Sequence, residues 1–386
     1  MILQAQTVVT MDGPPIADGA VVVDDSGRIV AVGPAWEIGG KPMLDLGASV
    51  LLPGLINAHC HLDYTGLRHA IPPQSSFTQW IRCLNALKRK LSADDYLAAI
   101  DAGFQELRAW GTTGVCNMLV FPELFSRLGT PPLRTWWFLE LIDLHSPVPA
   151  EMLAFSKERK LGLNPHAPYT ASPELYRLCA QTGLPLTTHL AESAEEEALF
   201  RRGEGELADL LREMGRPVRT YGRSSFSNAV RNGLVGPGWL LAHVNEVDEE
   251  DLALLAATPG EWHIVHCPRS HAFFRHAPFQ WERLAAAGAC ISLGTDSLAS
   301  NDSLNLFAEM QAAQKARPHL SSETLLKTVT THPARALGKA GELGVIRPGA
   351  RADLIALPYA GPAAQVYDAI VANRNPVPWM MLDGKF

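Results

Sequence analysis

The stretch VLLPGLINAHCH, residues 50–61, decides the fold class. It is a short apolar run, typical of a buried strand, and it ends in His59 and His61. Residues two apart on a strand point the same way, so both imidazoles can face one interior. Polar side chains at the end of a buried strand are typical of a parallel barrel, where the site lies at the carboxyl ends.

Seven further strand-like runs follow this one along the chain, at residues 114–117, 135–141, 161–165, 186–190, 240–244, 263–267 and 290–295. Helical stretches separate most of them, at residues 92–110, 172–182, 194–201, 249–257, 282–287 and 304–316. Ser92 and Ser172 are good N-caps for two of these helices. Eight strands that alternate with helices predict an α/β fold, a parallel (β/α)₈ TIM barrel.

The two ends of the chain have a different pattern. Residues 20–23 and 28–32 are apolar and flank residues 24–27, which form a hairpin turn signal. Residues 353–357 and 369–371 are short apolar runs that we expect to be strands. We therefore predict a β-sandwich domain formed by residues 1–50 and 345–386, attached to a metal-dependent barrel formed by residues 51–344.

The composition limits the possible partners. The chain has 386 residues, 47% of them hydrophobic, and a formal net charge of −7. This acidity disfavours nucleic acid as a partner, and no apolar run is long enough for a membrane span. Six scattered cysteines and an N-terminus without a secretory pattern predict a cytoplasmic protein with reduced thiols. The expected partner is a small-molecule substrate.

Chemically capable residues end four of the predicted strands. His59 and His61 end the first, His189 the fifth, and Asp296 the eighth, so that three imidazoles and one carboxylate can surround Zn²⁺ or Fe²⁺. His243 ends the sixth strand. One buried histidine alone is more often hydrogen-bonded core, and Asp296 alone could cap the next helix. The combination favours a metal site.

These residues carry a family resemblance. Residues 52–61 resemble the first barrel strand of the amidohydrolase superfamily. Residues 166–170, 189–192 and 294–301 resemble its cytosine deaminase-like branch, which includes S-adenosylhomocysteine, guanine and aminodeoxyfutalosine deaminases and triazine chlorohydrolases. The resemblance covers almost the whole chain, and its motifs are specific for the branch but not for the substrate.

The resemblance implies roles for individual residues. His59, His61, His189 and Asp296 correspond to the metal ligands, and Asp296 can also accept a proton from water. Glu192 corresponds to the general acid and base, and His243 to the histidine that orients the attacking water or polarises the substrate. The fourth predicted strand has no lysine after its start that could bridge two metals. One divalent metal is therefore expected, with zinc favoured over iron.

The implied activity is hydrolytic deamination. Metal-bound hydroxide would attack a ring carbon that carries an amino group, and ammonia would leave. The expected substrate is an amino-substituted heterocycle, above all an adenine-type nucleoside related to aminodeoxyfutalosine or adenosine. The alternative is an amidohydrolase or chlorohydrolase that acts on a cyclic amide, pterin, pyrimidine or triazine with the same metal shell.

Four further residues are candidate substrate contacts. His166 ends the fourth strand and is expected to face the substrate, although it could instead brace the following loop. Phe77 and Trp80 could stack on a heterocycle or form one packed helix face. Arg269 could bind a substrate carboxylate or form a surface ion pair.

One departure from the branch narrows the substrate. S-adenosylhomocysteine deaminases carry an arginine near the end of the third strand, where this chain has Glu140. Residues 61–67, 76–80 and 267–271 are nearer to the aminodeoxyfutalosine deaminase-like group, whose substrate is an adenine-type nucleoside that carries a benzoate. Barrels of this type often form dimers, so a homodimer remains open.

Overall fold

The computed structural model describes residues 1–144 and 146–386. It has an α/β fold in which two sheets are entirely parallel. One contains β14 (Asp296–Ser297), β6 (Leu55–His61), β7 (Thr112–Leu119), β8 (Arg134–Leu141) and β9 (Gly162–Pro165), in that order. The other contains β10 (Thr187–Leu190), β11 (Leu240–His243), β12 (Trp262–His266) and β13 (Ala289–Leu293).

Hydrogen bonds connect the edges of these two sheets. Leu163, in β9, forms a parallel bridge with Leu186, just before β10. The amide of His189 donates to the carbonyl of His166 at 2.8 Å. On the other side, the amide of Thr295 donates to the carbonyl of His59 at 3.0 Å. The carboxyl ends of β6, β10, β11 and β13 therefore lie on one side of the fold.

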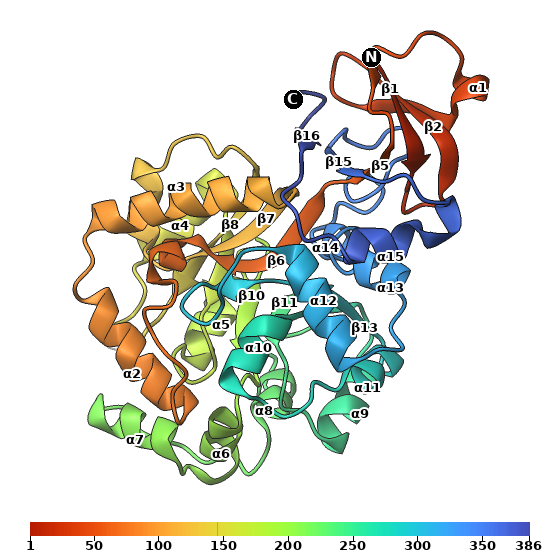
Figure 1. The fold of residues 1–386 in the computed structure, drawn as a ribbon. Coiled ribbons are helices and arrows are strands. Elements are labelled where there is room, and N and C mark those ends of the chain that lie inside the picture. The colour runs from red at the N-terminus through yellow and green to blue at the C-terminus, as the bar shows by residue number, and fades with distance from the viewer. Residues whose placement is uncertain (145) are drawn as a thin grey trace.

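Helices follow most of the parallel strands and cover them (Figure 1). They are α2 (Phe77–Lys88), α3 (Ala93–Ala109), α4 (Ala150–Arg159), α5 (Pro173–Ala180), α6 (Ala194–Arg202), α7 (Glu206–Glu213), α8 (Ser225–Arg231), α9 (Glu249–Ala257), α10 (Pro268–Phe274), α11 (Trp281–Ala286), α12 (Leu306–Ala316), α13 (Ser322–Lys327) and α14 (Thr331–Ala336). The hydroxyls of Ser92 and Ser172 cap α3 and α5, as predicted. Among the described residues, no helix is long and apolar enough to cross a membrane.

The two ends of the chain share one sheet, so they lie close together in Figure 1. Its seven strands are β1 (Ile2–Val8), β2 (Ile16–Val23), β3 (Ile29–Pro34), β4 (Leu44–Asp45), β5 (Ser49–Pro53), β15 (Leu354–Pro358) and β16 (Trp379–Met381). The short helix α1 (Ala35–Ile38) follows β3. The predicted hairpin is β2 and β3, which pair antiparallel.

Two predicted strands differ from the structure. Residues 50–61 do not form one strand, because the chain leaves the end sheet at Gly54 and then enters β6. A Cβ at Gly54 would lie 2.2 Å from the side chain of Thr113, so the close approach requires glycine. The strand predicted at residues 369–371 is also wrong. Those residues lie in α15 (Val366–Val371), where Val366 and Ile370 are buried one helical turn apart.

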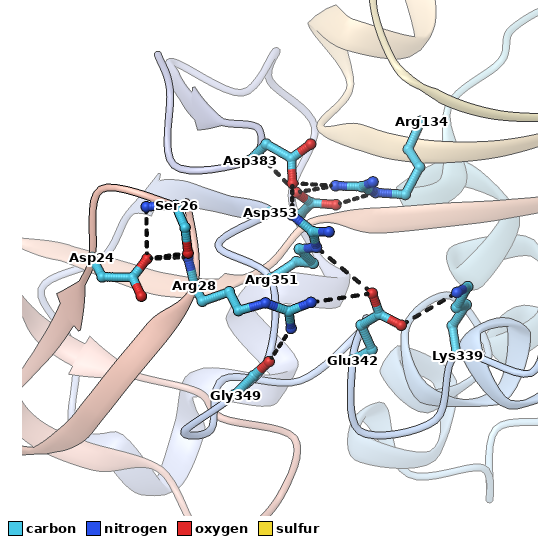
Figure 2. Close-up of polar contacts among 10 residues, drawn as sticks. All are labelled: Asp24, Ser26, Arg28, Arg134, Lys339, Glu342, Gly349, Arg351, Asp353 and Asp383. Atoms are coloured by element: carbon cyan, nitrogen blue, oxygen red, sulfur yellow. Dashed lines mark hydrogen bonds and ion pairs between the residues drawn. The ribbon is translucent and has the colours of Figure 1, made fainter.

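The end sheet is joined to the parallel strands by a network of charged side chains (Figure 2). Arg134, at the start of β8, donates to Asp353 at 2.8 Å and to Asp383 at 2.7 Å. Arg351 also donates to Asp383, at 3.1 Å. Burial lowers the pKa of Arg134, but its hydrogen bonds to Asp353 and Asp383 outweigh this effect. The pKa therefore lies above its ordinary value. The C-terminal segment of the end sheet is thus fixed against β8.

Candidate active site

Three histidines and one aspartate lie together at the carboxyl ends of the parallel strands. The ring nitrogens of His59, His61 and His189 lie within 4.8 Å of one another. The Nε2 atoms of His61 and His189 are 3.2 Å apart. Oδ1 of Asp296 lies 3.8 Å from Nε2 of both His59 and His61. The four residues expected to surround a metal are therefore brought together.

Neighbouring groups orient two of these side chains. Nδ1 of His189 lies 2.8 Å from the carbonyl oxygen of His166, so Nε2 is directed into the cluster. Oδ2 of Asp296 accepts from the hydroxyls of Ser270 at 2.7 Å and Ser300 at 3.2 Å, which leaves Oδ1 facing the histidines. Such contacts fix the ligand atoms of metal sites. Neither serine was predicted as part of the site.

The residues fit a divalent metal ion. Both ring nitrogens of His59, Nδ1 of His61 and Nε2 of His243 are buried without a hydrogen-bond partner among the described residues. Because buried polar atoms are nearly always paired, these unpaired nitrogens indicate that a partner such as a metal ion belongs among them. Around a tetrahedral zinc with bonds of about 2.1 Å, neighbouring ligand atoms lie about 3.4 Å apart. The observed spacings of 3.2 and 3.8 Å are close to this value.

Burial sets the charge states of the cluster. It lowers the pKa of His59 to about 3 and holds the pKa of His61 well below its usual range. The imidazoles are thus neutral, which is the form that binds a metal. Burial raises the pKa of Asp296, but electrostatic interaction with the rings of His243, His61 and His59, together with the hydrogen bond from Ser270, outweighs this and brings it below its ordinary value. The carboxylate is therefore ionised.

Glu192 and His243 lie beside the cluster. Oε1 of Glu192 is 3.6 Å from Nε2 of His243, and both residues have a ligand-type atom within 4.8 Å of one on Asp296. Burial, followed by the charges of Asp296 and Glu196, raises the pKa of Glu192 well above its usual range. A carboxyl group with a raised pKa can hold a proton near neutral pH and release it during a reaction.

Glu196, which was not predicted as a site residue, fixes the backbone that carries Glu192. Its side chain is fully buried. Oε1 accepts from the amide of Ala191 at 3.0 Å, and Oε2 accepts from the amide of Glu192 at 2.9 Å. Glu196 lies three residues after Ser193, the N-cap of α6. That spacing resembles a capping box, which predicts the start of a helix. It does not predict the contact between Glu196 and the backbone that precedes the helix.

A cavity of about 280 Å³ opens above the cluster, and three of the four predicted substrate contacts line it. Nδ1 of His166 lies 2.6 Å from the hydroxyl of Thr170, which fixes the ring. The rings of Phe77 and Trp80 stack on each other at 5.9 Å, and Trp80 donates to the carbonyl of Ala299 at 3.0 Å. These two residues thus form a packed helix face and a cavity wall at the same time.

Arg269 does not line this cavity. It lies on a neighbouring hollow of about 1040 Å³, where its guanidinium contacts the carboxylate of Asp302 and donates to Ser303 at 2.6 Å. Its charge is therefore already paired. The cavity is lined instead by two charged residues, Lys88 and Glu140, together with Glu192. Neither Lys88 nor Glu140 was predicted as a substrate contact.

Comparison with known proteins identifies the family. Residues 50–385 match the amidohydrolase family. The chain belongs to the amidohydrolase family. Among curated relatives, this amidohydrolase is 32% identical to a 5-methylthioadenosine/S-adenosylhomocysteine deaminase of Syntrophobacter fumaroxidans, over 93% of the chain and 84% of the relative. It is 29% identical to an aminodeoxyfutalosine deaminase of Deinococcus radiodurans, over 81% of each protein.

Two solved structures of other proteins have the same fold as this amidohydrolase. The aminofutalosine deaminase of Helicobacter pylori in complex with methylthio-coformycin superimposes with a TM-score of 0.86 at 22% identity, covering 100% of this chain and 99% of that one. An adenosine deaminase from Xanthomonas campestris with bound zinc gives a TM-score of 0.83 at 24% identity, covering 100% and 92%.

Proposed function

We propose that this amidohydrolase is a metal-dependent deaminase that removes the amino group from an adenine-type nucleoside and releases ammonia. The observation that carries the proposal is the cluster of His59, His61, His189 and Asp296, with the protonatable carboxyl of Glu192 beside it. The names of the relatives support the same activity, since they include deaminases of three adenine nucleosides.

His59, His61, His189 and Asp296 would hold one divalent ion, and zinc suits this set of three imidazoles and a carboxylate. When bound, the ion supplies an activated water at neutral pH. The zinc named with the Xanthomonas structure supports the same choice of metal.

The chain's own residues would move the protons and position the substrate. Glu192 would protonate the ring nitrogen next to the reacting carbon and later deliver a proton to the departing ammonia. His243, 3.6 Å from Glu192, would orient the water or polarise the reacting ring, and Asp296 would accept the proton of the water. His166, Phe77 and Trp80 would contact the heterocycle from the cavity wall.

The proposed division of the chain follows from this site. The edge hydrogen bonds between the two parallel sheets support one closed eight-stranded barrel that begins with β6 at Leu55 and lies within residues 55–344, with β13 and β14 as parts of a single strand. The seven-stranded sheet would then belong to the separate β-sandwich domain of residues 345–386 and the N-terminal segment, which extends past the expected boundary at residue 50 to Pro53 because Leu51, Leu52 and Pro53 pair with β15.

The test is ammonia release combined with metal analysis on one preparation. The panel contains adenosine, 5′-methylthioadenosine, S-adenosylhomocysteine and aminodeoxyfutalosine, with guanine, a pterin, cytosine and an aminotriazine as competing classes. We expect ammonia from at least one adenine nucleoside and about one metal ion per chain. Release only from the competing classes, or none with the metal bound, would refute the proposal.

Glu192→Gln is expected to abolish most of the activity while the metal stays bound. The amide preserves the shape of the side chain but cannot transfer a proton, so kcat should fall by about 10² to 10⁴. Elemental analysis should give the same metal content as in the unsubstituted protein. Full activity in this variant would exclude Glu192 as the acid and base.

His59→Ala combined with His61→Ala should remove the metal. The double variant loses two of four expected ligands, and two remaining ligands form no closed shell. We expect less than one tenth of the original metal content by elemental analysis. The exposed pair His69→Ala and His319→Ala is the matched control and should keep its metal. Equal metal content in both double variants would contradict the ligand assignment.

A further inference from the structure

An unpaired cation lies in the wall of the substrate cavity. Lys88 is the last residue of α2 and is half-buried. Its Nζ lies 5.5 Å from the ring centre of Tyr64 and 5.4 Å from that of Phe121. Among residues 1–144 and 146–386 its ammonium group forms neither an ion pair nor a hydrogen bond, although its backbone carbonyl accepts from the hydroxyl of Tyr96. Burial lowers the pKa of Lys88, and the charges of Glu140 and Asp63 offset this in part. An ammonium group removed from water is stable only with a partner.

A carboxyl group without a partner lines the same cavity. Glu140 is the next-to-last residue of β8, at the carboxyl end of the strand, and is only 7% exposed. Within the part of the chain that the structure describes, its side chain accepts no hydrogen bond. Burial raises the pKa of Glu140 to about 7, and the charge of Lys88 opposes this shift. The cavity thus contains one cation and one carboxyl that the proposed chemistry does not use.

Apolar side chains form much of the remaining wall of the same cavity. This apolar wall is formed by side chains from α2 and α7 and by the residue that follows α7, namely Trp80, Ile81, Leu84, Leu207, Leu210, Leu211 and Met214. Outside this wall, Ser76 donates to Glu206 at 2.6 Å and Arg82 pairs with Glu213 at 2.7 Å, which ties the two helices together. The wall is therefore a built surface that suits an aromatic ring or a thioether chain.

This inference rests on the proposed function and names the substrate class. We propose that Lys88 and Glu140 form a recognition site for the end of the nucleoside that is remote from the reacting ring. Lys88 binds a carboxylate at that end, and Glu140 accepts a hydrogen bond from a hydroxyl or ammonium group. The apolar wall covers the part of the nucleoside between that end and the reacting ring.

The charges of the site favour a carboxylate over a phosphate. Lys88 is a single positive charge, and it shares the cavity with the buried carboxyl of Glu140. A phosphate monoester brings close to two negative charges, more than Lys88 alone can neutralise, and a neighbouring carboxyl disfavours them more strongly than a single charge. A carboxylate brings one negative charge, which the ammonium can neutralise with a charge-assisted hydrogen bond.

Two kinds of nucleoside offer this chemistry, and one experiment separates them. Steady-state kcat/KM is measured for 5′-methylthioadenosine, which is uncharged, and for adenosine 5′-monophosphate. It is also measured for aminodeoxyfutalosine, which carries a benzoate, and for S-adenosylhomocysteine, which carries a carboxylate and an ammonium. We expect the unsubstituted protein to prefer at least one carboxylated nucleoside over 5′-methylthioadenosine by about tenfold or more.

Lys88→Met should reduce that preference by about tenfold to a hundredfold, mainly through KM, because the charged hydrogen bond is lost. Lys88→Arg keeps the charge and should retain most of the preference. Lys90→Met, at an exposed lysine just beyond α2, is the matched control and should behave like the unsubstituted protein. Glu140→Gln should reduce kcat/KM most for S-adenosylhomocysteine if the carboxyl meets an ammonium, and equally for both carboxylated nucleosides if it meets a hydroxyl.

The outcomes distinguish this proposal from the proposed function. If no adenine nucleoside releases ammonia, the proposed function itself fails. If 5′-methylthioadenosine or the monophosphate is the preferred substrate, the deaminase stands and the carboxylate site is refuted. An unchanged preference in Lys88→Met, or its loss in Arg269→Met instead, would also overturn the assignment to Lys88. Unaltered kinetics in Glu140→Gln would remove Glu140 from the site.

Discussion

Several residues of the site have backbone conformations that side chains rarely adopt. Ala191, His243 and Asp296 have φ angles of 50°, 74° and 56°. Each such residue costs on the order of 1–3 kcal/mol, and persists only where the surrounding contacts stabilise it. Ala191 is held on both sides, since its amide donates to Glu196 at 3.0 Å and its carbonyl accepts from Asn245 at 2.9 Å. The strain lies where the chain leaves the strands and turns into the site.

Glu196→Gln is expected to slow catalysis without removing the metal. The carboxylate accepts from two backbone amides, whereas a glutamine amide has one oxygen and must turn its NH₂ group toward one of these buried N–H groups, of which only that of Ala191 has a second acceptor, Ser225 Oγ at 3.1 Å. An unpaired buried group costs about 1–3 kcal/mol, so Glu192 should lose its position. We expect kcat to fall by about tenfold with KM and metal content nearly unchanged, measured by steady-state kinetics and elemental analysis.

Glu174→Gln, at an exposed glutamate of α5, is the control for this substitution and should leave the kinetics unchanged. A purely structural role for Glu196 would instead lower the amount of active enzyme, so that kcat per bound metal would stay constant. That result would contradict the positioning role.

Some site residues could be predicted from the sequence, namely those that belong to the site because they lie at the end of a strand. His59, His61, His189 and Asp296 belong to this class, because one period and one fold rule place them together. Ser270 in α10 and Lys88 in α2 could not be inferred in this way. Their contacts depend on how these helices pack over the strand ends, which no local pattern expresses.

At the scale of elements, the approach of β6 to the segment between β13 and β14 determines the geometry of the cluster. Gly294 lies in that segment, where an added Cβ would be 2.7 Å from the carbonyl oxygen of His59 and 2.9 Å from its Cβ. The strand that carries two of the expected ligands can therefore approach only a glycine.

Gly294→Ala should weaken metal binding and lower stability. The added methyl group must displace the end of β6, and overpacking of this kind costs about 1–3 kcal/mol. We expect a lower midpoint of thermal unfolding and faster metal loss to a chelator. Gly13→Ala, where nothing lies within 4 Å of the added Cβ, serves as the comparison. Identical metal loss in the two variants would show that β6 tolerates the displacement.

Element types followed from the sequence more reliably than element boundaries. The periodic helices α3, α9 and α12 have ends within two residues of those predicted. The prediction failed where a short apolar run had two interpretations, because residues 366–371 suit a strand or one buried helix turn equally. It also joined β5 to β6, since the need for glycine at position 54 arises only from contact with Thr113.

At the scale of the whole molecule, residues far apart in the sequence fix the end sheet to the parallel strands. β5 pairs with β1 in parallel and with β15 antiparallel, and one residue, Gly54, separates it from β6. The end sheet therefore anchors the strand that carries His59 and His61. Arg134, Asp353 and Asp383 form a second connection between the same two parts (Figure 2).

Arg134→Met should destabilise the protein by about 3 kcal/mol, because Asp353 is only 6% exposed and would be left as an uncompensated buried charge. Urea unfolding at pH 7 measures this as a lower midpoint. Arg159→Met is the control, since Arg159 is 58% exposed and lies 3.8 Å from Glu158, so its loss should cost less than about 1 kcal/mol. Because the connection fixes the sheet that anchors β6, metal should also dissociate faster from Arg134→Met than from Arg159→Met. Equal midpoints for the two variants would mean that strand pairing alone holds the end sheet in place.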